Sequence, residues 1–407
     1  MVKYLSMISA IQWKKRRSSS KEMRRARGGR MRRIQRRDDF VAPEITFDLV
    51  IEILSRLPAK SLMRFRCVSK LWFGLIRSRY FSNLHLTKKI SSSPPCGEPL
   101  LLYVDFCTKS ELLSLTLSSS NAAESSWLEP DFTFPGMGGM GVHRTLIFRG
   151  LILYTFCQKS FIYNPATRQR LNLPTITFAQ QERSHKNVYY FFGHDPVLDQ
   201  YKIVCNVFER WITSEFWVFV LEPGSVWKRI EYDDQPHAPS RQGLCMDGVI
   251  YYLASTPTCP NNVYCFDVRS EEIRAIQAPH AVSQFSKLLN FIEHGGKPTL
   301  FDYTHIRETG VSELWVLEDG LGGTWSRKSL VLKPCQRHLV DNIIIGRMVH
   351  STPQNSEIIL ALPSHSYLLY YDLIKNDLRK VNIIRATTRD VYIRVMDICE
   401  NILHLEA

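Results

Sequence analysis

The sequence predicts a multidomain α+β protein in which a small unit of three helices precedes a large all-β region. Apolar residues recur at helical spacing over residues 44–86, whereas from Leu100 onward short apolar runs alternate with turn residues. Within the second region a strand-turn-strand pattern returns about every 50 residues. With 407 residues, 44% of them hydrophobic and 22% charged, the chain can bury more than one core.

Residues 1–40 form a basic arm in which we expect no stable fold. They hold 14 Lys and Arg against 3 Asp and Glu, a net charge of +11, so most of the +13 of the whole chain lies here. Like charges at this density repel one another and resist packing. Such clusters serve as nuclear-import signals or phosphate-binding arms, and the alternative is a solvated extension or a start site assigned too far upstream. The candidate nuclear-localisation residues are Lys14, Lys15, Arg16, Arg17, Arg24 and Arg25.

Residues 41–88 are predicted to form a compact helical unit. Asp48 suits the first turn of its first helix, Pro58 ends that helix, and a second helical run opens after Lys60. The unit carries more large apolar side chains than so small a bundle can bury, so some of them should face a partner. A linker rich in Ser and Pro is predicted at 89–99.

Residues 100–407 are predicted to form a six-bladed, kelch-like β-propeller. Five copies of the pattern are separated by 56, 47, 51 and 54 residues, and a weaker copy precedes them at 112–130. A period of about 50 residues with four short strands is typical of kelch-type blades. The alternating Val391, Ile393 and Val395, within 389–405, predict a strand that closes the ring on the first blade. The aligned positions of the five copies are Tyr163, Phe219, Phe266, Leu317 and Tyr371.

A pair of β-sandwiches is the alternative fold for this region. The Gly-Gly doublet that is typical of kelch repeats is absent from most copies, and His294-Gly295-Gly296 is a single instance. Sandwiches are also built from many short strands separated by turns, so periodicity alone leaves both folds open.

No motif predicts bond chemistry, a cofactor or a metal. GMGGMG (136–141) has G-x-G-x-x-G spacing, but Pro135 precedes it and a strand-like run follows, so the helix that a dinucleotide site needs is missing. Cys335 and His338 have no second pair of ligands nearby in the sequence. The ten cysteines include no C-x-x-C pair, which fits free thiols. No stretch approaches the roughly 18 apolar residues of a membrane-spanning helix.

Residues 44–86 resemble an F-box. The family usually has Pro where this chain has Thr46, and because Thr can cap a helix the start signal is kept. The residues that carry the match are Asp48-Leu49, Ile53-Leu54, Leu57-Pro58, Lys60-Ser61-Leu62, Arg66-Cys67-Val68-Ser69-Lys70, Trp72 and Ile76.

The β region resembles the F-box-associated interaction domain of a large plant family. The matching segments are SFIYNPATRQRLNLP (160–174), FGHDPVLDQYKIV (192–204), VWKRIE (226–231) and LCMDGVIYYLA (244–254). Together the two halves look like a plant F-box protein of this type. The resemblance implies a non-catalytic substrate-recognition adaptor of a Skp-cullin-F-box ubiquitin ligase. Its F-box would dock a Skp-type adaptor and, through it, cullin and RING subunits, and its β domain would bind a protein substrate.

The same resemblance implies a set of adaptor-binding residues. The alternative is that half of them build the core of the unit itself, with Leu62 and Trp72 the first candidates for a partly internal position. Two other functions stay open: nucleic-acid binding through the basic arm, and a propeller hydrolase or oxidase. The β region shows no basic stripe with interleaved aromatics, so nucleic acid is not expected as a main partner. We expect the protein in the nucleus, the cytoplasm or both, with the arm favouring the nucleus. The implied adaptor-binding residues are Leu49, Ile53, Leu54, Leu57, Pro58, Leu62, Val68 and Trp72.

Overall fold

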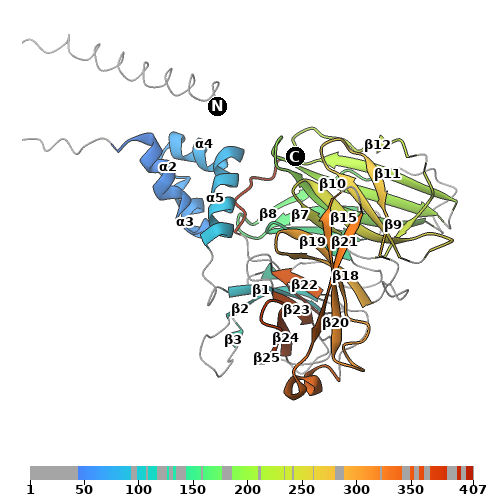
Figure 1. Ribbon diagram of the computed structural model, residues 1–407. Helices are drawn as coiled ribbons and strands as arrows, with labels where there is room; N and C mark the ends of the chain where they lie inside the picture. The colour runs from blue at the N-terminus through green and yellow to red at the C-terminus, as the bar shows by residue number, and fades with distance from the viewer. Residues whose placement is uncertain are drawn as a thin grey trace, which may run out of the picture. The chain divides into compact units, whose positions relative to one another are not determined.

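A computed structural model describes the helical unit and most of the strand region (Figure 1). The basic arm, with its candidate nuclear-localisation residues, lies outside the described residues, as does GMGGMG. The described residues are 45–92, 99–106, 109–116, 126–127, 132–133, 144–156, 159–176, 186–209, 212–232, 234–240, 243–259, 261–279, 288–320, 323–341, 349–352, 357–361, 367–382, 392–395 and 400–406.

Within residues 45–92, four helices rather than the predicted three follow one another. They are α2 (Phe47–Ser55), α3 (Ala59–Phe65), α4 (Lys70–Arg77) and α5 (Arg79–Ser92). Because α5 runs to Ser92, the first residues of the predicted linker are helical, and α3 begins at Ala59, before the predicted start after Lys60.

The breaks between these helices have local causes. Pro58 has an extended backbone with ψ 148° and separates α2 from α3. The Ser69 hydroxyl accepts the Trp72 N–H at 3.1 Å and caps α4. Ser78, again extended with ψ 142°, separates α4 from α5. The helical unit is therefore a chain of short helices, each started or stopped by a single residue.

The described strands form six antiparallel sheets. The first contains β26 (Tyr392–Val395), β1 (Pro99–Phe106), β2 (Lys109–Thr116) and β3 (Ser126–Trp127), with β4 (Phe132–Thr133) beside β2. The second contains β5 (Arg144–Phe148), β6 (Leu151–Phe156), β7 (Lys159–Asn164) and β8 (Gln169–Asn172). The third contains β9 (Lys186–Asp195), β10 (Gln200–Glu209), β11 (Thr213–Val220) and β12 (Lys228–Ile230).

The last three sheets repeat this arrangement. The fourth contains β13 (Ala238–Pro239), β15 (Val249–Ser255), β16 (Asn262–Asp267) and β17 (Ile273–Ile276), with β14 (Leu244–Met246) beside β15. The fifth contains β18 (Leu289–His294), β19 (Lys297–Asp302), β20 (Val311–Asp319) and β21 (Thr324–Val331), and the short helix η3 (Pro334–Leu339) follows it. The sixth contains β22 (Val349–Thr352), β23 (Glu357–Ala361), β24 (Tyr367–Asp372) and β25 (Asp377–Asn382).

The predicted repeat coincides with these sheets. Each of the five aligned positions lies on the third strand of its sheet (β7, β11, β16, β20 or β24), and all five side chains are buried. The repeat is therefore one sheet long, and its aligned aromatic or leucine side chain is a core residue.

The hydrophobic cores lie between successive sheets, which is the arrangement of a β-propeller. Ile203 and Val204 are neighbours on β10, yet Ile203 packs in a core with the second sheet and Val204 in a core with the fourth. Two further cores join the fourth sheet to the fifth and the fifth to the sixth. A sheet in a sandwich buries one face, whereas both faces of the third, fourth and fifth sheets are covered by different neighbours, so the sandwich alternative is wrong.

The predicted closing strand is present in shortened form. β26 pairs antiparallel with β1, with Val395 opposite Leu102 and Tyr392 opposite Asp105. Residues 400–405, which belong to the predicted closing segment, are not in a strand. That the six sheets are six kelch-like blades of one ring stays a prediction, because strand pairing alone does not place sheets around a common axis.

One type of hairpin loop recurs in the propeller. Asp195 Oδ1 accepts the N–H groups of Val197 and Leu198 at 2.8 and 3.3 Å, and the fourth loop residue, Asp199, has φ +56°. Non-glycine residues rarely adopt this left-handed backbone, and Asn and Asp tolerate it best. The same loop follows Asn164, Asp267 and Asp372 and ends in the left-handed residues Arg168, Glu271 and Asn376.

Two tryptophans join neighbouring sheets by equivalent hydrogen bonds. Trp227 Nε1 donates to the Pro174 carbonyl at 2.7 Å, and Trp325 Nε1 donates to the Gln277 carbonyl at 2.8 Å. Both tryptophans occupy the same place in the repeat, and so do both acceptors, which follow the last strand of the preceding sheet. The repeat therefore sets inter-sheet contacts as well as the strands.

Trp227→Phe should lower the free energy of unfolding by about 1 kcal/mol, because the ring is kept and one hydrogen bond is lost. Denaturant unfolding measures this. Trp325→Phe should have a similar effect, whereas Val226→Ala, at an exposed neighbour, should have none. A Trp227→Phe curve that superimposes on that of Val226→Ala would refute the role of the bond.

Among the described residues, no helix has both the length and the apolar character to cross a bilayer.

Candidate protein-docking surface

The core of the helical unit takes up part of the predicted adaptor-binding set. Leu54 is 1% exposed and Leu62 is 0% exposed, and they are buried with Ile76, Phe81 and Leu86. These two leucines therefore build the core of the unit, so neither is available on its surface as the predicted adaptor-binding set requires. Of the two, the sequence had singled out only Leu62 as a candidate for the core. Leu57 and Trp72 are half-buried.

Four other members of the set lie open on the surface. Leu49 is 54% exposed, Ile53 51% and Val68 60%, and Pro58 is exposed as well. Leu49 and Ile53 are one turn apart on α2, so their side chains lie on the same face of that helix. Burying a side chain of this size contributes about 1.5–3 kcal/mol, so leaving several exposed is costly unless a partner covers them.

Further apolar side chains of the helical unit are exposed that the sequence analysis did not select. They were missed because helical spacing assigns them to the interior as readily as Leu62. A high density of large apolar residues in a short segment is the one signal that points to them. They are Phe65, Leu71, Phe73 and Tyr80.

Ring contacts hold the α3–α4 turn, which carries Val68. Phe65 and Trp72 meet edge to face with ring centroids 5.6 Å apart. The Arg66 and Arg77 guanidinium groups lie 5.4 and 5.0 Å from the centre of the Phe73 ring. The turn is thus fixed by side chains from α3 and α4.

Helix α5 contacts both α2 and the connection between α2 and α3. His85, which is buried, has Nε2 2.9 Å from the Leu57 carbonyl oxygen. Burial lowers the pKa of His85, against the opposing effect of this carbonyl. Glu52 on α2 pairs with Lys88 on α5 and with Arg56, and the hydrogen bond from Lys88 is the main cause of the lowered pKa of Glu52. The backbone at Leu57-Pro58, between α2 and α3, is therefore held in place by contacts with α5.

The other features singled out in the sequence have structural roles where they are described. Gly295 and Gly296 form the two-residue turn between β18 and β19, with φ +59° and +74°. Cys335 and His338 lie in η3, and among the described residues no cluster of His, Cys, Asp or Glu could hold a metal ion. Four tryptophans pack on the cores between sheets, Trp211 lies outside the described residues, and nothing is described of the Trp127 side chain; the four are Trp217, Trp227, Trp315 and Trp325.

Comparison with known proteins agrees with this division of the chain. The F-box domain family matches residues 43–84, and the F-box associated beta propeller domain family matches residues 101–403. The Arabidopsis thaliana F-box protein At5g62660 is 53% identical, over 92% of this chain and 99% of its own length. F-box protein At4g19940 of the same plant is 42% identical, over 89% and 92%. F-box/LRR-repeat protein At2g40920, also from Arabidopsis thaliana, is 39% identical, over 85% and 82%.

Three observations agree: the helical unit has an exposed apolar surface, successive sheets pack as in a propeller, and the family matches cover both parts of the chain. The chain belongs to the plant F-box proteins that carry an F-box associated β-propeller domain.

Proposed function

We propose that this protein is the substrate-recognition adaptor of a Skp-cullin-F-box ubiquitin ligase. The observation that carries the proposal is the exposure of Leu49, Ile53 and Val68 on an F-box whose own core is already filled. A Skp-type adaptor covers this surface and brings the cullin and RING subunits. The docking set consists of Leu49, Ile53, Leu57, Pro58, Val68 and Trp72.

The double substitution Leu57→Asp with Pro58→Ala tests the docking set. It places a charge and removes a rigid corner at the centre of the proposed interface, so affinity for the Skp-type adaptor should fall by about 2 kcal/mol or more, roughly thirtyfold. Binding of the purified full chain to the purified adaptor measures this.

Because Leu57 is half-buried, thermal unfolding is recorded on the same samples, and the comparison is made below the unfolding transition. Arg56→Ala, next to Leu57 but outside the set, is the control and should bind like the unchanged protein. Equal binding by the double variant would remove Leu57 and Pro58 from the interface.

In this proposal the propeller binds a protein substrate, and other subunits carry out ubiquitin transfer. This part of the proposal is supported by the fold together with the family membership. A fold does not identify a substrate, so the substrate has to be found by experiment. Affinity purification of the tagged chain from plant cells treated with a proteasome inhibitor should recover adaptor, cullin and an accumulated substrate. Recovery of the tagged chain without adaptor and cullin would count against the ligase.

We also propose that the six sheets are six kelch-like blades of one closed ring. The support is the pairing of β26 with β1, which joins the end of the β region to its beginning, and the cores between successive sheets. An experimental density map viewed along the ring axis would count the blades directly, and five or seven would overturn the number.

The basic arm is proposed as a nuclear address. Replacing Lys14, Lys15, Arg16, Arg17, Arg24 and Arg25 by alanine removes six charges and should shift a fluorescently tagged protein toward the cytoplasm. Alanine at the exposed propeller residues Lys228 and Lys375 is the control. An unchanged nuclear fraction would reject the signal.

The same arm variant tests the alternative of nucleic-acid binding. That function requires an affinity that falls by about 0.9 log units per phosphate contact and decade of salt. Eight of the 14 Lys and Arg remain in the variant, so it should weaken the binding, and deletion of residues 1–37 should abolish it.

A further inference from the structure

The C-terminal segment Glu400–Glu406 contacts the propeller through every second residue. Asn401 Nδ2 donates to the Arg149 carbonyl at 2.8 Å, and the Leu403 carbonyl accepts Asn164 Nδ2 at 2.8 Å. Leu403 and Leu405 are buried in the core between the second and third sheets. One side of this segment is therefore part of the propeller.

The two glutamates at the ends of the segment, Glu400 and Glu406, contact the F-box. Glu400 Oε2 accepts the Ala59 N–H at 2.9 Å, at the first residue of α3, and lies 3.6 Å from Lys89 Nζ of α5. Glu406 pairs with Arg77 of α4. In an extended chain successive side chains point to opposite sides, which explains how seven residues can serve two domains.

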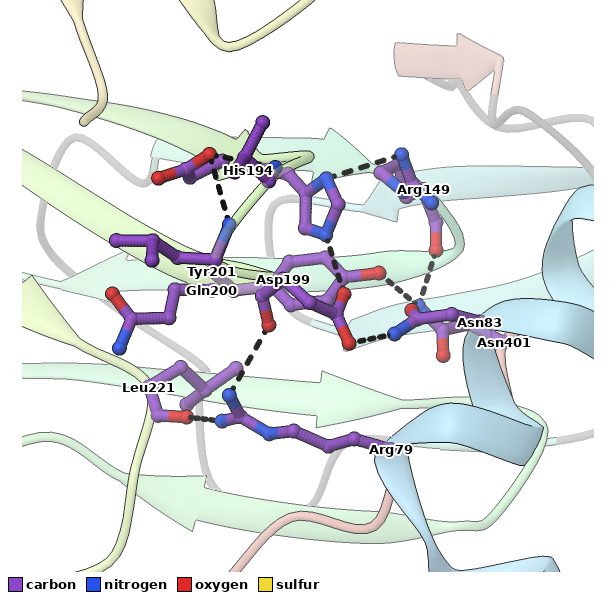
Figure 2. Close-up of polar contacts among 12 residues, drawn as sticks. Arg79, Asn83, Arg149, His194, Asp199, Gln200, Tyr201, Leu221 and Asn401 are labelled. Atoms are coloured by element: carbon purple, nitrogen blue, oxygen red, sulfur yellow. Dashed lines mark hydrogen bonds and ion pairs between the residues drawn. The ribbon is translucent and has the colours of Figure 1, made fainter. Parts of the chain in front are cut away.

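Helix α5 makes a second contact with the propeller, shown in Figure 2. The Arg79 guanidinium donates to the carbonyls of Asp199 and Leu221 at 3.2 and 2.5 Å. It also lies 3.1 Å from Glu222 Oε1. One turn later, Asn83 Nδ2 donates to Asp199 Oδ2. Arg79 thus holds three acceptors on two loops of the third sheet, which a lysine ammonium on its flexible stem could not match.

Asp199 links the two contacts through the side chains of His194 and Arg149 (Figure 2). His194 Nε2 lies 2.9 Å from Asp199 Oδ1, and His194 Nδ1 lies 3.4 Å from an Arg149 Nη. Because arginine can only donate, Nδ1 accepts and Nε2–H donates to the carboxylate. The Arg149 carbonyl in turn accepts Asn401 Nδ2. A continuous path therefore runs from α5 through the propeller loops to the C-terminal segment.

We infer that Glu400–Glu406 and α5 together fasten the F-box to the propeller, with Arg79, Asn83, Asp199 and Glu400 as positioning residues. Single exposed ion pairs would not do this, because each contributes little and allows motion. Two contacts with several directional hydrogen bonds each, backed by the buried Leu403 and Leu405, restrict both translation and rotation. The consequence for the ligase, which rests on the proposed function, is that a substrate on the propeller is presented at one fixed orientation to the adaptor.

Distance measurements between spin labels on the full chain test the fastening itself. Cys67 on the F-box and Cys335 in η3 are exposed and take the labels, after Cys245, Cys259 and the four cysteines outside the described residues (Cys96, Cys107, Cys157 and Cys399) are replaced by serine. The unchanged interface should give one narrow distance distribution. Arg79→Ala with Asn83→Ala and Glu400→Ala should at least double its width.

Two further variants distinguish positioning from a general loss of stability. Asp199→Asn keeps a residue that tolerates positive φ and an acceptor for His194, while Asn83 can turn its amide to match, so the distribution should stay narrow. Asp199→Ala should broaden it. Arg56→Ala, which removes an ion pair inside the F-box, is the matched control and should change nothing. A broad distribution in the starting protein, or an unchanged width in the triple variant, would overturn the inference.

Binding to the Skp-type adaptor, measured on unlabelled samples, separates this inference from the proposed function. The triple variant should bind the adaptor as well as the starting protein does. If neither binds, the proposed function fails while the distance result stands. In a reconstituted ligase, self-ubiquitination of propeller lysines such as Lys228, Lys297 and Lys375 should be confined to a subset and should spread in the triple variant. An unchanged lysine pattern despite broadened distances would overturn the positioning role.

Discussion

Replacing Leu49 and Ile53 by aspartate should weaken binding to the Skp-type adaptor by at least a hundredfold while leaving the fold intact. Both side chains are more than half exposed in the free chain, so charges there cost little in folding. In the complex each would be buried, and losing two contacts of about 1.5–3 kcal/mol each exceeds the roughly 2.7 kcal/mol that a hundredfold change requires. Titration calorimetry with the purified adaptor measures the effect.

The matched control for this pair is Ile374→Asp. Ile374 is 68% exposed on the loop between β24 and β25 of the propeller, so the substitution has the same chemistry away from the F-box. It should leave adaptor affinity unchanged. Thermal unfolding of both variants should match that of the starting protein. An affinity within threefold of the starting value for the Leu49 and Ile53 variant would show that this face of α2 is not the docking surface.

Acidification should destabilise the propeller through His237. This side chain is fully buried; its ring nitrogens lie 2.9 Å from the hydroxyl groups of Tyr232 and Tyr252, and its ring stacks on Tyr264 at 3.8 Å. Burial lowers the pKa of His237 from 6.5 to about 4. The unfolded chain therefore binds a proton more readily than the folded one. Stability is fully present above about pH 6.5 and is lost as the pH falls toward 4, by about 3 kcal/mol in total.

Denaturant unfolding at a series of pH values from 7.5 to 4 measures this loss. His237→Gln keeps a polar, hydrogen-bonding side chain that cannot titrate, so its free energy of unfolding should fall less over the same range. Burial also lowers the pKa of His85, His294 and His404, which give slopes of the same sign in both proteins, and the difference between the two curves isolates His237. Parallel curves would show that His237 does not titrate on unfolding in this range.

The helical unit and the repeat could be predicted from the sequence because both depend on local periodicity. Pro58 and Ser69 act on the backbone next to them, so the breaks they cause follow from residue type. The five aligned third-strand residues are buried because every sheet presents the same position to its neighbour. Such regularities lie within short segments, and they sufficed to predict a helical unit followed by a repeated β region. The F-box was identified by its resemblance to a family, and periodicity alone left the propeller and the sandwich pair open.

The sequence could predict which residues belong to the candidate docking surface and the core beneath it, but not which of them are exposed. Leu54 and Ile53 are adjacent and equally apolar, yet one is buried and the other exposed, because packing against the other helices decides which side of α2 is covered. The extension of α5 to Ser92 was missed because Ser-rich sequence predicts a linker, and local propensity is readily overridden by tertiary context.

The sequence by itself determined that this protein joins an F-box to a repeated β domain. Only the tertiary structure decided how the two are fastened. Arg79 meets Asp199 across 120 residues, and Ala59 meets Glu400 across 341. The physical reason is that hydrogen bonds and buried contacts depend on distance in space, and no spacing along the chain records which distant residues folding brings together.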